Sequence, residues 1–211
     1  MGDQVKTAGA GLSAMDNEYQ NMTTPAADKD DRPLIGISAC LNGQRVRYDG
    51  KDKFNALVAE HLAPYCRLLP FCPEAVAGLG IPRPPVNLVQ TATGVRAIGR
   101  DAPHTDVTPR LHTIASAFCN AHPGISGFIL QSRSPSCGLA TTPIYDMRQQ
   151  QVLDATGSGL FAARLRARFP DLPILNDCDL SAERIHAFLR QVAAYQSRQQ
   201  TAAQSAGISY A

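Results

Sequence analysis

The chain has 211 residues, of which 44% are hydrophobic, and its formal net charge is +2. A chain of this length suits one ordinary domain with tails, and it can bury a core without disulfide bonds. The small net charge excludes the basic face that duplex nucleic acid requires, and no apolar run approaches the roughly 18 residues that cross a bilayer. We therefore expect neither nucleic acid nor a membrane as a partner.

The two ends of the chain show no sustained hydrophobic period. We predict a disordered N-terminal tail at residues 1–32, an α/β domain at 33–195 and a flexible C-terminal tail at 196–211. The N-terminal segment lacks the basic start and apolar block of a signal peptide, so we expect a cytoplasmic protein with reduced thiols. In a reduced compartment, the six cysteines of the chain favour metal binding, catalysis or core packing over disulfides.

The first half of the predicted domain alternates strand and helix patterns. The apolar run Leu34–Ala39 predicts a buried strand, and residues 54–65 place apolar side chains on one face of a helix. Arg67–Phe71 reads as a second strand that contains a proline. A proline-rich stretch at 81–85 separates it from a hairpin predicted around Thr93–Gly94.

The second half continues the alternation. Thr108 followed by Pro109 predicts an N-cap and the first residue of a helix. Gly157–Gly159 precedes another helix; these glycines could cradle an anion, but a plain helix start is the favoured interpretation. Ser181 is the predicted N-cap of the last helix, with flanking apolar residues at staple spacing. Two further strands are predicted at 127–131 and 172–176.

Repeated strand–helix units with apolar strands predict a single α/β domain, Rossmann-like or flavodoxin-like, with a mainly parallel sheet covered by helices on both faces. In such sheets, ligands bind beyond the carboxyl ends of the strands. Cys40, Cys72 and Cys137 follow the first three predicted strands. Because adjacent parallel strands lie about 4.8 Å apart, three strand ends can bring these thiols around one centre.

Three thiols could serve several purposes. Soft sulfur ligands select zinc, copper(I) or iron–sulfur clusters. A structural zinc ion normally has four protein ligands, and no histidine stands beside these cysteines. A cysteine can also pack in the core or act as a metal-free nucleophile. The residues alone therefore predict a metal or thiol site and leave its occupant open.

Four separated blocks resemble the signature of the TudS-type thiouracil desulfidase family, a bacterial domain formerly of unknown function. Within about residues 33–195 they are, in order, Ser38–Gly43, Val46–Gly50, Cys72–Glu74 and Arg133–Gly138. The resemblance implies a [4Fe–4S] cluster bound by Cys40, Cys72 and Cys137, with one iron open to the substrate. It also implies acid and base roles for Glu74 and Ser134.

The activity that the resemblance implies is removal of sulfur, as hydrosulfide, from thiouracil or a related thio-substituted pyrimidine. Water would add to the thiocarbonyl carbon with Glu74 as base, while Ser134 relays or donates a proton. The alternative is a non-catalytic iron–sulfur or metal-binding module that handles sulfur or iron. The oligomeric state stays open, with a homodimer as one candidate.

Further residues near these blocks are weighed individually. Arg47, Asp49 and Ser136 are candidate substrate-binding residues, although Arg47 and Asp49 fit a structural ion pair equally well. Arg83 lies between prolines, and we expect its side chain in solvent. Cys178 is interpreted as structural, because its two flanking aspartates would place negative charge beside an anionic cluster.

Overall fold

A computed structural model describes residues 31–205 of the chain, so the predicted N-terminal tail lies outside the described residues except for its last two positions. Residues from Arg32 onward form one compact unit. Within the described part, no helix combines the length and the apolar character needed to cross a bilayer.

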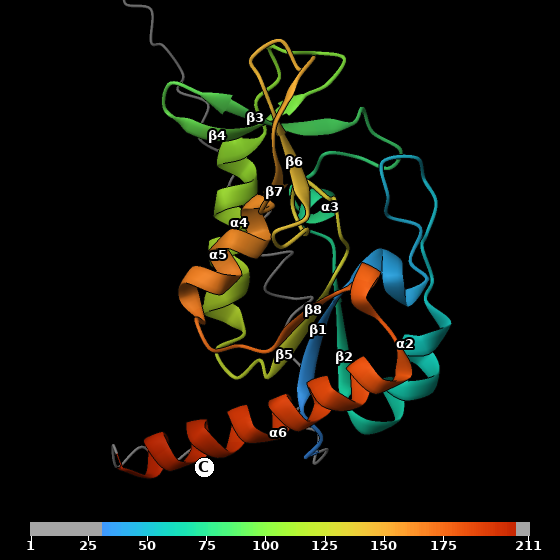
Figure 1. Cartoon of the computed structure of the whole chain (residues 1–211), viewed down its shortest axis with the longest axis vertical. Coiled ribbons are helices and arrows are strands. Elements are labelled where there is room, and N and C mark those ends of the chain that lie inside the picture. Colours follow the sequence, from blue (N-terminus) through green and yellow to red (C-terminus); the bar gives the residue numbers. More distant parts are fainter. Residues whose placement is uncertain (1–30, 206–211) are drawn as a thin grey trace, which may run out of the picture. The chain divides into compact units, whose positions relative to one another are not determined.

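A four-stranded sheet forms the base of the fold, and all of its strand pairs are parallel. The strand order is β2-β1-β5-β8, so the chain builds outward from β1 on one side and then returns to the other side of β1 (Figure 1). This reversal creates a topological switch point, where open α/β sheets bind ligands. The strands are β1 (Leu34–Ser38), β2 (Arg67–Phe71), β5 (Gly127–Leu130) and β8 (Ile174–Asn176).

Helices cover both faces of this parallel sheet, as the sequence predicts. On one face lie α2 (Ala56–His61) and α6 (Ala182–Ser205) (Figure 1). They enclose a core that includes Ile35 and Ile37 of β1. On the other face lie α4 (Thr108–Ala121) and α5 (Leu160–Arg168). Their core is aromatic and comprises Phe71, Phe118, Phe128 and Phe161, whose ring centroids lie 4.4–5.8 Å apart.

A second, mixed sheet with the order β4-β3-β6-β7 packs beyond the carboxyl ends of the first (Figure 1). The β3–β4 pair is the predicted hairpin, whereas the β6–β7 hairpin has no counterpart among the predicted elements. Residues 152–156 of β7 are exposed, so they lack the apolar alternation that reveals a half-buried strand. The strands are β3 (Val86–Thr91), β4 (Gly94–Gly99), β6 (Thr142–Tyr145) and β7 (Val152–Gly157).

Short helical turns connect several of these elements. The predicted helix at 54–65 is interrupted: α2 ends at His61, and Pro64 lies within a separate 3-10 turn. These turns are η1 (Ala39–Asn42), η2 (Ala63–Tyr65), α3 (Pro73–Val76) and η3 (Asp177–Asp179).

Two helix boundaries differ from the sequence prediction. Thr108 is the first residue of α4 and not its N-cap; its hydroxyl accepts a hydrogen bond from Ala97 N, while Asp106 accepts the Thr108 N–H at 2.9 Å. The C-terminal helix α6 extends to Ser205, so residues 196–205 are helical where a flexible tail was predicted. These residues contain no proline or glycine, and they continue a helix already nucleated by its packed first half.

Candidate functional site

Three cysteines from distant parts of the chain line one pocket at the carboxyl ends of the parallel strands. Cys40 lies in η1 after β1, Cys72 is the N-cap of α3 after β2, and Cys137 follows β5. The pocket has a volume of about 510 Å³, and residues flanking the second sheet form another part of its wall. The strand order β2-β1-β5 therefore brings together the three thiols that the sequence separates.

Burial sets the protonation state of these thiols. Burial, and to a lesser degree the nearby Cys72 sulfur, raise the pKa of Cys40 to about 11. Burial and the two neighbouring cysteines raise the pKa of Cys137 well above its ordinary value, and burial also raises that of Cys72. Thiols in this state are protonated at neutral pH, which disfavours a metal-free thiolate nucleophile.

The donor set fits an iron–sulfur cluster better than a single ion. Across residues 31–205, no three side chains of His, Cys, Asp or Glu converge closely enough to bind one metal ion. In a cubane cluster each cysteine binds a different iron, so the sulfurs stand farther apart than the ligands of one ion. The three thiols line one pocket and are the ligand type that holds such clusters. The Cys40 sulfur also lies 3.8 Å from the amide oxygen of Gln131.

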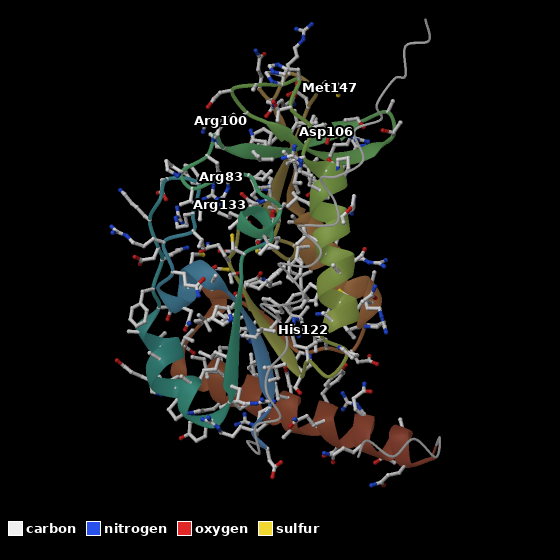
Figure 2. The ribbon with its side chains drawn as sticks, turned by 180° about the vertical axis from the view of Figure 1, so that it is seen from behind. Arg83, Arg100, Asp106, His122, Arg133 and Met147 are labelled. Atoms are coloured by element: carbon white, nitrogen blue, oxygen red, sulfur yellow. The ribbon has the colours of Figure 1, made fainter. Side chains whose placement is uncertain are left out.

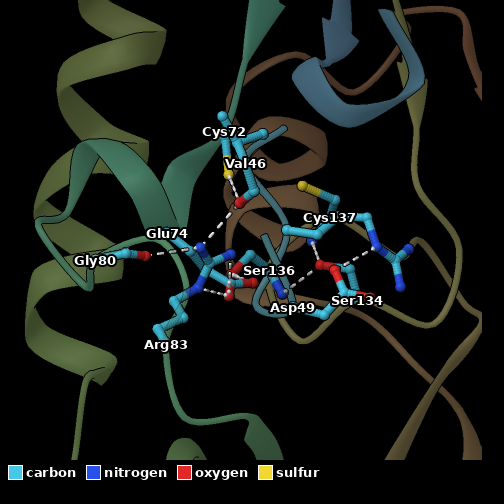
Figure 3. Close-up of polar contacts among 10 residues, drawn as sticks. Val46, Asp49, Cys72, Glu74, Gly80, Arg83, Ser134, Ser136 and Cys137 are labelled. Carbon is cyan, nitrogen blue, oxygen red and sulfur yellow. Dashed lines mark hydrogen bonds and ion pairs between the residues drawn. The ribbon is translucent and has the colours of Figure 1, made fainter. Parts of the chain in front are cut away.

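Glu74 reaches the pocket from the first turn of α3 and is almost completely buried. Its Oε2 lies 2.9 Å from both Nε and Nη2 of Arg83, and its Oε1 accepts a hydrogen bond of 2.9 Å from Ser136 Oγ (Figure 3). The expectation that Arg83 lies in solvent is wrong, because only 8% of the residue is exposed. A buried guanidinium needs a partner, and Glu74 supplies the opposite charge.

Ser134 also lines the pocket, and its hydroxyl oxygen is held by the following turn. That oxygen accepts backbone hydrogen bonds from Ser136 N at 3.2 Å and Cys137 N at 3.0 Å. Because both bonds use the oxygen as an acceptor, the hydroxyl proton remains available for donation. Ser134 therefore caps the turn that leads to Cys137.

The turn that carries Cys137 is fixed by the start of α5. The N–H groups of Gly159, Leu160 and Ala162 donate to carbonyl oxygens of residues 135–138 at 2.7–3.0 Å. A Cβ atom on Gly159 would lie 2.4 Å from the carbonyl carbon of Ser136, so glycine permits this close approach. These N–H groups are thus occupied by the turn, in agreement with the plain helix-start interpretation of Gly157–Gly159.

The three candidate substrate-binding residues occupy different positions. Arg47 lines the pocket, and its Nε also lies 3.3 Å from Asp49 Oδ1, so this arginine both faces the pocket and forms an ion pair. Asp49 is not among the residues that line the pocket. Ser136 is completely buried behind it, with its hydroxyl on Glu74.

Several basic side chains lie in the pocket wall. Figure 2 shows Arg83, Arg100 and Arg133 on the same side of the molecule, and all three line the pocket. The lining contains five basic side chains and one acidic side chain, Glu74. Four of the basic groups are paired with carboxylates: Arg47 with Asp49, Lys53 with Asp177, Arg83 with Glu74 and Arg100 with Asp101. The basic residues are Arg47, Lys53, Arg83, Arg100 and Arg133.

The other cysteines lie outside this pocket. Cys66 and Cys119 are buried core residues, as expected for thiols that only pack. Cys178 is exposed in η3. Sequence reasoning missed Gln131, which lines the pocket beside Cys40; its position directly after the buried strand β5 was the available signal.

Three comparisons with known proteins each find a match to this chain. The profile of a family described as 2-thiouracil desulfurase matches residues 35–177, which include all three pocket cysteines. A curated relative, the uncharacterized protein YbbK of Bacillus subtilis (strain 168), is 30% identical over 146 residues, which span 63% of this chain and 89% of the relative. Among solved structures, the [4Fe-4S]-dependent thiouracil desulfidase TudS is 32% identical with a TM-score of 0.56, covering 75% of this chain and 99% of that one.

Proposed function

Because the chain belongs to the 2-thiouracil desulfurase family, we propose that it removes sulfur from thiouracil or a related thiobase with the help of a [4Fe–4S] cluster on Cys40, Cys72 and Cys137. The observation that carries this proposal is the meeting of three thiols from three strand ends in one pocket. The [4Fe-4S]-dependent thiouracil desulfidase TudS, which shares the fold, supports the choice of cluster.

When bound to three cysteines, such a cluster would supply one Lewis-acidic iron with affinity for the sulfur of the substrate. The protein's own contribution is to hold the pyrimidine in a pocket of about 510 Å³ lined by basic side chains. A small planar base fits that volume. A reduced compartment such as the cytoplasm suits the three thiols, and the cytoplasmic location remains a prediction.

The proposed reaction is a hydrolysis in which the C=S bond is replaced by C=O. One water is consumed and hydrogen sulfide leaves as hydrosulfide, so no oxidant or reductant is needed. Glu74 takes a proton from the water that attacks carbon; its Oε1 keeps a free lone pair beside the Ser136 bond. Ser134 relays the second proton: its hydroxyl, fixed by two N–H groups, protonates the departing sulfur and takes a proton in return from the hydroxyl added to carbon as the C=O bond forms.

The first experiment is anaerobic preparation followed by quantitation of iron and acid-labile sulfide. A cluster held by thiolates is expected to absorb near about 400 nm. The loaded protein should then release sulfide from 2-thiouracil or 4-thiouracil. Loaded protein that releases sulfide from neither base would favour the non-catalytic module.

Glu74→Gln tests the assigned base, since it keeps the shape of the side chain and removes its basicity. We expect the rate of sulfide release, measured per bound cluster, to fall by about 10²–10⁴-fold, the usual contribution of general acid–base catalysis. If the variant carries the cluster and releases sulfide at the rate of the unmodified protein, then Glu74 is not the base.

A further inference from the structure

We infer that Arg83 is a positioning residue that ties the three cysteine-bearing loops into one preformed cradle. This inference rests on the proposed function, because it assumes that the three cysteines bind a cluster. It goes further by assigning a role to a residue outside the cysteine blocks. It also gives Glu74 a second role, as the link between two of the loops.

Arg83 contacts the loop after β1 directly. Its Nη1 donates to Val46 O at 2.9 Å, and its backbone N–H donates to Tyr48 O at 2.9 Å. The Sγ of Cys72 lies 3.8 Å from the same Val46 carbonyl oxygen (Figure 3). Arg83 thus fixes a carbonyl group of the Cys40-bearing loop, and the Cys72 thiol contacts the same carbonyl group.

The other two loops are joined through Glu74. Its carboxylate follows Cys72 by two residues and receives Nε and Nη2 of Arg83, both at 2.9 Å. The second carboxylate oxygen accepts the hydroxyl of Ser136, which precedes Cys137. One guanidinium and one carboxylate therefore connect all three cysteine-bearing loops, and the remaining Nη1 bond to Gly80 O anchors the arginine to its own loop.

Burial makes this connection selective for one geometry. The exposed fraction is 4% for the Arg83 side chain and 11% for that of Glu74, while Ser136 is completely buried. Removal of Arg83 leaves Glu74 and Val46 O without their shared donor, and an unpaired polar group at a largely buried position is costly. The loops would then be free to separate, and a cluster would bind to less well-placed thiols.

The test compares Arg83→Met with the control Arg166→Met. Arg166 also clamps two carbonyl oxygens through Nη1, those of Pro170 and Leu172, but it lies outside the cysteine pocket. The readout is the rate at which anaerobically loaded protein loses iron to an excess of a chelator. Because outer residues at metal sites typically change metal affinity by 10–100-fold, we expect Arg83→Met to lose iron about 10–100-fold faster and Arg166→Met to be unchanged.

Arg83→Lys should restore part of the retention, because it returns the charge to Glu74 without the planar fork that also reaches Val46 O. If Arg83→Met does not fold, the double variant Glu74→Leu/Arg83→Met replaces the buried pair by apolar side chains, which proteins often tolerate. We expect this double variant to lose iron about 10–100-fold faster than the unmodified protein, as expected for Arg83→Met.

Iron loss at the unmodified rate from Arg83→Met, or from the double variant, would overturn the inference and leave the proposed function standing. Equal acceleration by Arg166→Met would also overturn it, since any destabilised protein would then behave alike. Unmodified protein that takes up no iron would refute the proposed function together with this inference.

Discussion

Gly159→Ala offers a direct test of how α5 supports the Cys137 turn. The added Cβ would lie 2.4 Å from Ser136 C, 2.5 Å from Ser136 O and 2.8 Å from Cys137 N. All three are backbone atoms, which cannot move aside by a side-chain rotation. Relief of the contact therefore requires the helix start and the turn to separate, which strains the hydrogen bonds from Gly159 N and Ala162 N to that turn.

The size of the effect follows from the cost of overpacking, about 1–3 kcal/mol. For a protein of this length, each kcal/mol lowers the melting temperature by about 2–4 °C, so we expect a decrease of about 2–12 °C. A thermal melt of the metal-free protein measures this decrease. Iron content after anaerobic loading should also fall, because the backbone of Cys137 is displaced.

Gly124→Ala is the matched control. A Cβ at this position would meet no atom within 4 Å, and the residue does not require a left-handed conformation. We expect a melting temperature equal to or above that of the unmodified protein, because alanine restricts the unfolded chain more than glycine does. If Gly159→Ala melts at the same temperature as this control and binds the same amount of iron, then the proposed contact between α5 and the turn is wrong.

The remaining predictions concern pH and the cysteines. Burial would raise the pKa of Asp177, but its bonds to Lys53 Nζ and to a backbone N–H lower it. The stabilisation from the ionised carboxylate is present above about pH 4 and is lost as pH falls through the lowered pKa. In urea unfolding, the free energy of Asp177→Asn should therefore fall less steeply in acid than that of the unmodified protein. Burial lowers the pKa of His122, so the unfolding free energy should decline as pH falls below about 6.5. His122→Phe should abolish that decline. If the unfolding free energies of His122→Phe and the unmodified protein change equally with pH, then this assignment is wrong. Cys178→Ser should leave iron content and sulfide release unchanged, whereas Cys137→Ser should lose iron, and loss of iron from both would argue for a fourth cysteine ligand.

The parallel sheet could be predicted because its strands carry a strong local signal. Runs such as Gly127–Leu130 are apolar throughout, which is typical of strands buried on both faces. A pocket cysteine follows each of the first three predicted strands. This was enough to expect three thiols at one edge of a parallel sheet. Only local pattern and general rules for α/β sheets were needed.

The β6–β7 hairpin and the buried ion pair could not be predicted in the same way. β7 has an exposed surface and therefore no hydrophobic period. The burial of Arg83 depends on Val46 and Glu74, which lie 37 and 9 residues away in the chain. No local pattern around Arg83 encodes these partners, and its neighbouring prolines suggest an exposed loop. The burial of a charged residue therefore cannot be predicted from the local sequence when its partners come from other loops.

The two sheets contribute different parts of the pocket wall. The cysteines follow strands of the parallel sheet, whereas Asn87 belongs to β3 of the mixed sheet and Arg100 directly follows β4. Under the proposed function, substrate preference and cofactor retention could therefore diverge independently. Exchange of the β3–β4 hairpin between related proteins offers a route to altered thiobase selectivity, with the sulfur ligands left intact.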